Sequence, residues 1–190
     1  MFISQTGIIL QKIPYSEADE IITVLLKEQG VHRFFAHGSR KSKKKFQGLL
    51  DHFAHLHFEY QISNKGLWTL RDVQRLAHES QSVLSLEAYA VLSYLAELIT
   101  EFVPEGGGDH GLYDLWLELQ AEVKLRTPTD QLANKYLTRF FARVGYALHS
   151  PMPLKEMTHF SERILQKKSR AAEFFLRTLT PTRSMCSRSS

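Results

Sequence analysis

Five cations crowd into six positions of the sequence and are followed at once by an aromatic residue: Arg40, Lys41, Lys43, Lys44, Lys45 and Phe46. Closely spaced ammonium and guanidinium groups bind phosphates by charge, and a neighbouring ring can stack on a base. The pattern predicts a clamp for a polyanion, with Phe46 as a surface platform or as a plug that pins the segment. The alternative is a solvated loop that only keeps the protein soluble.

The rest of the chain carries its charge unevenly around a net value of +4. Residues 1–78 hold 11 Lys/Arg and 7 Asp/Glu, and residues 79–123 hold 9 acids without a single Lys or Arg. Residues 124–190 hold 13 Lys/Arg and 4 acids. This asymmetry favours a polyanion partner for the two basic parts and a separate role for the acidic middle.

The basic segment must be positioned by the strands around it. Apolar, β-branched runs predict strands over 7–13, 20–27 and 31–37, with a tight turn at Gly30, and strict alternation predicts a fourth strand over 53–62. A fifth strand is expected over 67–76. Five short antiparallel strands favour closure, because a closed barrel has no unpaired edges. We therefore expect a five-stranded β-barrel domain over residues 1–78.

Beyond residue 79 the apolar period becomes helical. Ser85 is a plausible N-cap for a helix over 85–102, Asp109 for a second helix, and Thr127 or Thr129 for a third that ends near Gly145. A last helix is expected over 154–179. The predicted fold class is α+β, with the barrel followed by an all-α helical domain over 79–180. Residues 181–190 have little to bury and are expected to be a disordered tail.

A small barrel with a lysine-rich connection after its third strand is the layout of an oligonucleotide-binding (OB) fold. Phe34, Phe35 and Trp68 are further candidates for base stacking, although barrel cores also need large apolar side chains. The predicted DNA-binding residues are the following: Arg33, Arg40, Lys41, Lys43, Lys44, Lys45, Phe46, Lys65 and Arg71.

Other arrangements of reactive residues predict no chemistry. His52, His55 and His57 lack a clear further metal ligand, and Glu17 with Asp19 fits a turn better than acid–base catalysis. Cys186 is the only cysteine, so neither an intramolecular disulfide nor a thiolate zinc site is expected. No apolar run could span a membrane, and no signal peptide is evident. We expect a cytoplasmic, nucleoid-associated protein that is not an enzyme and needs no metal or cofactor.

The N-terminal residues resemble the RecO family of DNA repair proteins. The resemblance is carried by Pro14-Tyr15-x-Glu17-x-Asp19, by Gly30, by Ala36-x-Gly38 before the basic segment, and by Leu50-x-x-Phe53. The stretches "GYAL" and "QKKSRAAEFFLRTL" resemble the helical domain of the family more loosely. Two departures stand out: His37 occupies a position where arginine is expected, and the four-cysteine zinc module of many members is missing.

The resemblance implies binding of single- and double-stranded DNA, annealing of complementary strands, and work with RecR to load RecA onto DNA coated by single-strand-binding protein. The acidic C-terminal tail of that protein needs a cationic site, and the candidates are Arg139, Arg143, Lys167, Lys168 and Arg170. Two alternatives stay open. One is an RNA-binding barrel protein of the translation apparatus, and the other is a scaffold that binds acidic peptides without nucleic acid.

Overall fold

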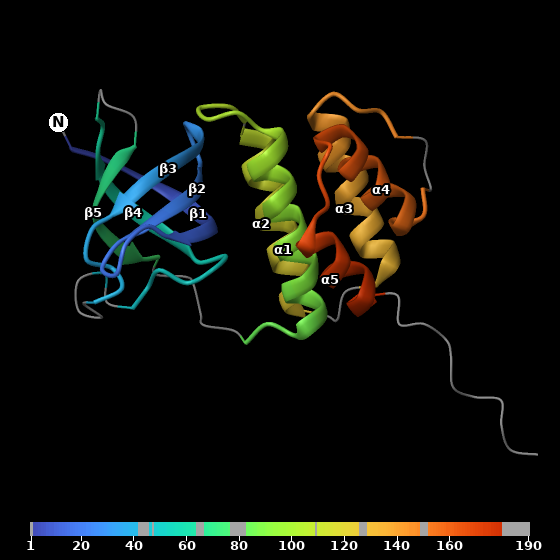
Figure 1. Ribbon diagram of the computed structural model, residues 1–190, viewed down its shortest axis with the longest axis horizontal. Coiled ribbons are helices and arrows are strands. Elements are labelled where there is room, and N and C mark those ends of the chain that lie inside the picture. Colours follow the sequence, from blue (N-terminus) through green and yellow to red (C-terminus); the bar gives the residue numbers. More distant parts are fainter. Residues whose placement is uncertain are drawn as a thin grey trace, which may run out of the picture. The chain divides into compact units, whose positions relative to one another are not determined.

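The computed structural model describes residues 2–41, 46, 48–63, 67–76, 83–108, 110–125, 129–148 and 152–179. Five strands are followed by five helices in this part of the chain (Figure 1). The strands are β1 (Phe2–Pro14), β2 (Glu20–Leu26), β3 (Gly30–Ala36), β4 (His55–Gln61) and β5 (Trp68–Arg75). The helices are α1 (Leu86–Phe102), α2 (His110–Leu125), α3 (Asp130–Arg143), α4 (Leu154–Leu165) and α5 (Arg170–Leu179). The predicted class, an OB-fold barrel followed by helices, is confirmed.

The strands close into a barrel in the order β1-β2-β3-β5-β4. The long strand β1 pairs antiparallel with both β2 and β4, and a register shift between Ile9 and Gln11 lets it turn from one partner to the other. A short parallel contact between β3 and β5, at Phe34 with Trp68, completes the ring. The barrel therefore has no strand without a neighbour on each side, as the sequence predicted.

Two strand boundaries differ from the sequence prediction by more than one residue. β1 begins at Phe2 instead of Gly7, because its first half pairs with β4 from Gln61 back to His55. β4 begins at His55 instead of Phe53, because Phe53 adopts φ 66°, which is incompatible with a strand. Alternation along β4 holds as expected, with Leu56, Phe58 and Tyr60 buried.

The barrel interior is filled from the strands and from the segment that follows the basic run. Its core includes Ile22, Val24 and Phe34 from β2 and β3. Phe46, Leu49 and Leu50, between β3 and β4, belong to the same buried cluster. The chain after the cations thus closes the interior of the barrel with apolar side chains.

The chain divides into two compact units. One unit comprises residues 1–82 and 96–117, and the other comprises residues 83–95 and 118–190. The end of α1 and the beginning of α2 therefore group with the barrel. The domain boundary after residue 78 stays a prediction, and the predicted tail 181–190 lies outside the described residues.

The helix caps follow the sequence closely. Ser85 accepts a hydrogen bond from the Ala88 amide at 3.1 Å, and Thr129 accepts one from the Leu132 amide at 3.3 Å. Asp109, the third candidate cap, lies outside the described residues. Among the described residues, no helix is both long and apolar enough to cross a bilayer.

The single helix predicted over 154–179 is wrong. α4 ends where Gln166 takes a left-handed conformation with φ 51°, and its amide bonds back to Glu162. Ser169 then starts α5, because its hydroxyl accepts from the Ala172 amide at 2.7 Å. The apolar period continues across this break, so periodicity alone could not reveal it.

Candidate nucleic-acid interface

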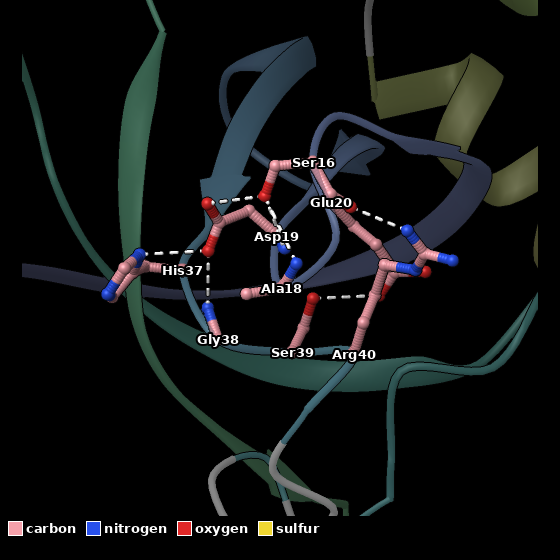
Figure 2. Close-up of polar contacts among 8 residues, drawn as sticks. All are labelled: Ser16, Ala18, Asp19, Glu20, His37, Gly38, Ser39 and Arg40. Carbon is pink, nitrogen blue, oxygen red and sulfur yellow. Dashed lines mark hydrogen bonds and ion pairs between the residues drawn. The ribbon is translucent and has the colours of Figure 1, made fainter.

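The loop between β1 and β2 is organised by one carboxylate, that of Asp19 (Figure 2). It accepts hydrogen bonds from the Gly38 amide at 2.8 Å and the Ser16 hydroxyl at 2.9 Å, and it pairs with His37 at 2.9 Å. The pKa of Asp19 is lowered, first by the Gly38 amide and then by the Ser16 hydroxyl, because both favour the charged form. Asp19 thus fastens the β1–β2 loop to the chain that leaves β3, and the expectation that it serves as a turn acceptor is confirmed.

The first two cations of the basic segment, Arg40 and Lys41, contact the same loop, and Figure 2 shows the contacts of Arg40. The Arg40 amide donates to the Ala18 carbonyl at 3.0 Å, and the Arg40 guanidinium donates to the Ser16 carbonyl. Lys41 lies 3.5 Å from the carboxylate of Glu17, and both side chains are largely exposed to solvent. The segment therefore leaves the barrel from a fixed starting point.

The far end of the basic segment is fixed as well. Lys43, Lys44 and Lys45 lie outside the described residues, but Phe46 directly after them is only 3% exposed and packs in the barrel core. This burial corrects the expectation of a surface platform and agrees with the alternative, a plug. Arg40 and Lys41 on one side of the cationic run, and Phe46 on the other, therefore all have contacts with the barrel domain.

Two of the other predicted DNA-binding residues, Arg33 and Arg71, have polar partners within the protein. Arg33 is 58% exposed, but its guanidinium donates to Glu105 at 2.9 Å. Arg71 donates to Gln61 and lies 5.9 Å from the centroid of the Phe2 ring. Lys65 lies outside the described residues. Glu105 was missed by the sequence analysis, because its loop lies 72 residues from Arg33 and nothing local connects them.

The aromatic side chains considered for base stacking differ in how far solvent can reach them. Phe34 is fully buried. Trp68 lies parallel to Tyr60 and His32, with ring centroids 5.2 Å and 3.8 Å away, so its faces are already occupied. Phe35 is half-buried, and its neighbour Tyr15, which the sequence analysis did not select, is 65% exposed. The Pro-Tyr-x-Glu-x-Asp signature was the only signal that could have pointed to Tyr15.

The cations proposed for an acidic tail belong to the helical unit. Arg139 pairs with Glu118 and lies 5.3 Å from the centroid of the Tyr136 ring, while Lys135 pairs with Glu122 at 2.8 Å. The pKa of Glu118 is lowered, chiefly by its hydrogen bond from Arg139. Any acidic ligand at this point must compete with Glu118.

A second group of these cations lines a shallow hollow at the end of α4. Lys167 and Lys168 border it, together with Arg163, His159 and Glu162. Arg170 is exposed at the first turn of α5, and Arg143 is exposed in the last turn of α3. The hollow combines several positive charges with one acid, an arrangement suited to a carboxylate or phosphate.

The histidines weighed as metal ligands have other roles. His55 Nε2 lies 2.6 Å from the Tyr113 hydroxyl, and the pKa of His52 is lowered mainly by burial. Within the described ranges, no group of three potential metal-ligating side chains comes together.

The fold places the barrel in a general structural class. A closed five-stranded barrel, with apolar side chains packed into its core from the segment after its third strand, has the layout of an OB-fold. Residues 1–77 match the family described as "Recombination protein O N terminal".

Similar proteins extend this match beyond the barrel. The chain is 30% identical over 147 residues to the DNA repair protein RecO of Syntrophotalea carbinolica, which covers 77% of this chain and 57% of that protein. It is 32% identical over 114 residues to RecO of Desulfosudis oleivorans, covering 59% and 44%. With RecO of Gloeobacter violaceus it is 30% identical over 128 residues, covering 67% and 48%. The chain is similar to RecO proteins, and it spans about half the length of the curated relatives it matches.

Proposed function

We propose that the protein is a DNA-binding mediator of recombinational repair and not an enzyme. It binds single- and double-stranded DNA, anneals complementary strands, and acts with RecR to load RecA onto DNA coated by single-strand-binding protein. It works in the cytoplasm, associated with the nucleoid. The observation that carries the proposal is the cationic segment tethered at Lys41 and Phe46 to an OB-fold barrel of the RecO N-terminal family.

The proposed annealing follows from charge. Two complementary backbones repel each other, and a surface that releases their counterions reduces that repulsion. Residues 1–78 carry a net charge of +4 and residues 124–190 carry +9, so both parts of the chain can contribute cations. The similarity to proteins named DNA repair protein RecO makes DNA the favoured polyanion.

The deciding experiment measures binding of a fluorescent single strand by anisotropy as a function of salt. A variant with Lys41, Lys43, Lys44 and Lys45 changed to glutamine should bind more weakly. Its slope of log K against log salt should shrink by up to about 3, since each neutralised phosphate contributes about 0.7 for a single strand. Changing the same four residues to arginine keeps the charge and should keep both the affinity and the slope.

Three results would argue against this proposal. Unchanged binding by the glutamine variant would remove the segment from the interface. Tighter binding of RNA than of DNA with the same base order would favour the translation alternative, because only RNA offers 2′-hydroxyls. Binding that ignores salt would favour the scaffold.

The acidic tail of single-strand-binding protein is proposed to bind the helical unit. The support is the pair of cationic features described above, Arg139 beside Glu118 and the hollow at Lys167 and Lys168. Arg139→Glu or Lys168→Glu should weaken binding of an acidic tail peptide severalfold and leave DNA affinity unchanged. Glu118→Gln removes the internal competitor and should tighten peptide binding if Arg139 is the contact. Equal losses of peptide and DNA affinity in both charge reversals would reject this division.

A further inference from the structure

Tyr15 and Phe35 form a pair of aromatic side chains beside strand β3 that solvent can reach. Tyr15 is 65% exposed, and its ring meets the half-buried Phe35 edge to face, with centroids 5.5 Å apart and planes at 89°. The Phe35 ring in turn lies nearly parallel to His37, at 6.0 Å and 26°. These rings therefore form one continuous aromatic group that is open to solvent at Tyr15.

The pair lies on the outside of the barrel, within a row of apolar side chains. Phe34 and Ala36, on either side of Phe35, are buried in the core, so Phe35 points outward. Phe35 pairs across the sheet with Ile21, and Ile21 pairs with Ile13, which is 46% exposed. A flat apolar strip therefore crosses β1, β2 and β3 beside Tyr15.

The same strip borders the start of the basic segment. Arg40 donates to the carbonyl of Ser16, directly after Tyr15, and Lys41 pairs with Glu17 one residue further. The other carboxylate of this loop, Asp19, binds the Gly38 amide, the Ser16 hydroxyl and His37. Positive charge is thus held within one or two residues of an exposed ring.

We propose that Tyr15 and Phe35 are the base-stacking surface of the barrel for single-stranded DNA, with Arg40 and Lys41 on the adjoining phosphates. Exposed rings next to cations are the combination that holds a single strand, whereas bases inside a duplex are already stacked on each other. A protein partner could use the apolar strip, but the flanking cations favour a phosphate backbone. This inference rests on the proposed DNA-binding function and names the contact that distinguishes single strands.

The test compares a single-stranded oligonucleotide of about 16 nucleotides, the upper end of an OB-fold site, with an abasic strand of equal phosphate number. The unmodified protein should bind the base-containing strand at least about tenfold more tightly, since stacking on one ring contributes on that scale. Tyr15→Leu and Phe35→Leu should lose most of this preference while the salt slope stays the same. Tyr15→Trp should keep it, and Tyr89→Leu, the same kind of change at an exposed tyrosine of the other unit, should have no effect.

A direct readout accompanies the affinities. A strand with 5-iododeoxyuridine should photocrosslink to the tryptic peptides 13–27 and 34–40, which contain Tyr15 and Phe35. Thermal unfolding of Tyr15→Leu checks that the fold is intact, because the side chain is mostly exposed.

Several results separate this inference from the proposed function. Salt-dependent binding without base preference overturns the stacking surface and leaves DNA binding standing. Unaltered binding by Tyr15→Leu also overturns it and would assign the strip to another contact, such as a protein partner. Equal losses on both strands would show that the tyrosine acts only by positioning the cations. If the unmodified protein binds neither strand, both proposals fall together.

Discussion

At the scale of single residues, Asp19 decides how the β1–β2 loop meets the basic segment. Its carboxylate binds the Gly38 amide, the Ser16 hydroxyl and His37, so contacts in two segments of the chain depend on one charge. Hydrogen bonds to the ionised form lower its pKa. The contribution of this carboxylate to holding the loop is therefore greatest while Asp19 is ionised.

Asp19→Asn should lower the melting temperature in a pH-dependent way. Because the folded pKa lies below the unfolded value of about 3.9, the contribution of the carboxylate to stability is complete above that value. The contribution is lost as the pH falls through the folded pKa. Melting curves should therefore show a gap between the two proteins at neutral pH that closes below about pH 4. Glu17→Gln, at a carboxylate that is 93% exposed, should show no such gap, and a gap constant with pH would contradict this role.

The sequence identifies candidate DNA-binding residues by their charge, but it does not show which way their side chains face. The run from Arg40 to Lys45 is evident from the sequence alone, and its contact with DNA stays a prediction. The sequence does not show where the barrel opens, so it could not decide whether the Phe46 side chain lies in the core or on the surface. Phe46 lies in the core. Tyr15 has no periodic pattern around it, so its exposure could only come from the folded loop.

At the scale of elements, the barrel followed from alternation and turn residues, and the errors lie where tertiary contacts override them. β1 is longer than its apolar run because residues 2–6, which show no clear strand pattern in the sequence, form hydrogen-bonded pairs with β4. The alternation of β5 falters at Asp72, where its pairing with β4 skips Arg71 through a bulge. The break between α4 and α5 depends on the conformation of Gln166, which no residue pattern announced.

Gly30, at the start of β3, is a position where only glycine allows a close backbone contact. It has φ 70°, and a Cβ added there would lie 1.9 Å from the carbonyl oxygen of Gly107, whose segment is bonded to Val31. Gly30→Ala should lower the free energy of unfolding by about 3 kcal/mol or more, because backbone strain and a backbone clash add.

Urea unfolding measures this effect, with Gly48→Ala as the matched control. Gly48 has a similar φ of 67°, but nothing lies within 4 Å of its added Cβ. That variant should lose only about 1 kcal/mol from backbone strain. Equal losses at the two positions would show that the approach of Gly107 does not constrain the barrel.

At the scale of the whole molecule, the acidic middle of the chain has an internal role. Glu105 pairs with Arg33 in the barrel unit, while Glu118 and Glu122 pair with Arg139 and Lys135 in the helical unit. The uneven charge seen in the sequence therefore serves partly to pair with cations of both basic parts. Cations of both proposed sites have acidic partners, since Arg139 pairs with Glu118 and Lys41 pairs with Glu17.

This arrangement predicts how two acidic ligands share the protein. The proposed DNA contacts lie in the barrel unit and the proposed peptide contacts lie in the helical unit, so a saturating acidic peptide should change single-strand affinity by less than about threefold at physiological salt. At low salt the effect of the peptide on DNA affinity should grow, because exposed charges then interact over a longer distance. Anisotropy of labelled DNA, titrated with peptide at two salt concentrations, measures both values. Full displacement of DNA by the peptide at physiological salt would mean that one basic surface serves both ligands and would remove the division of labour between the units.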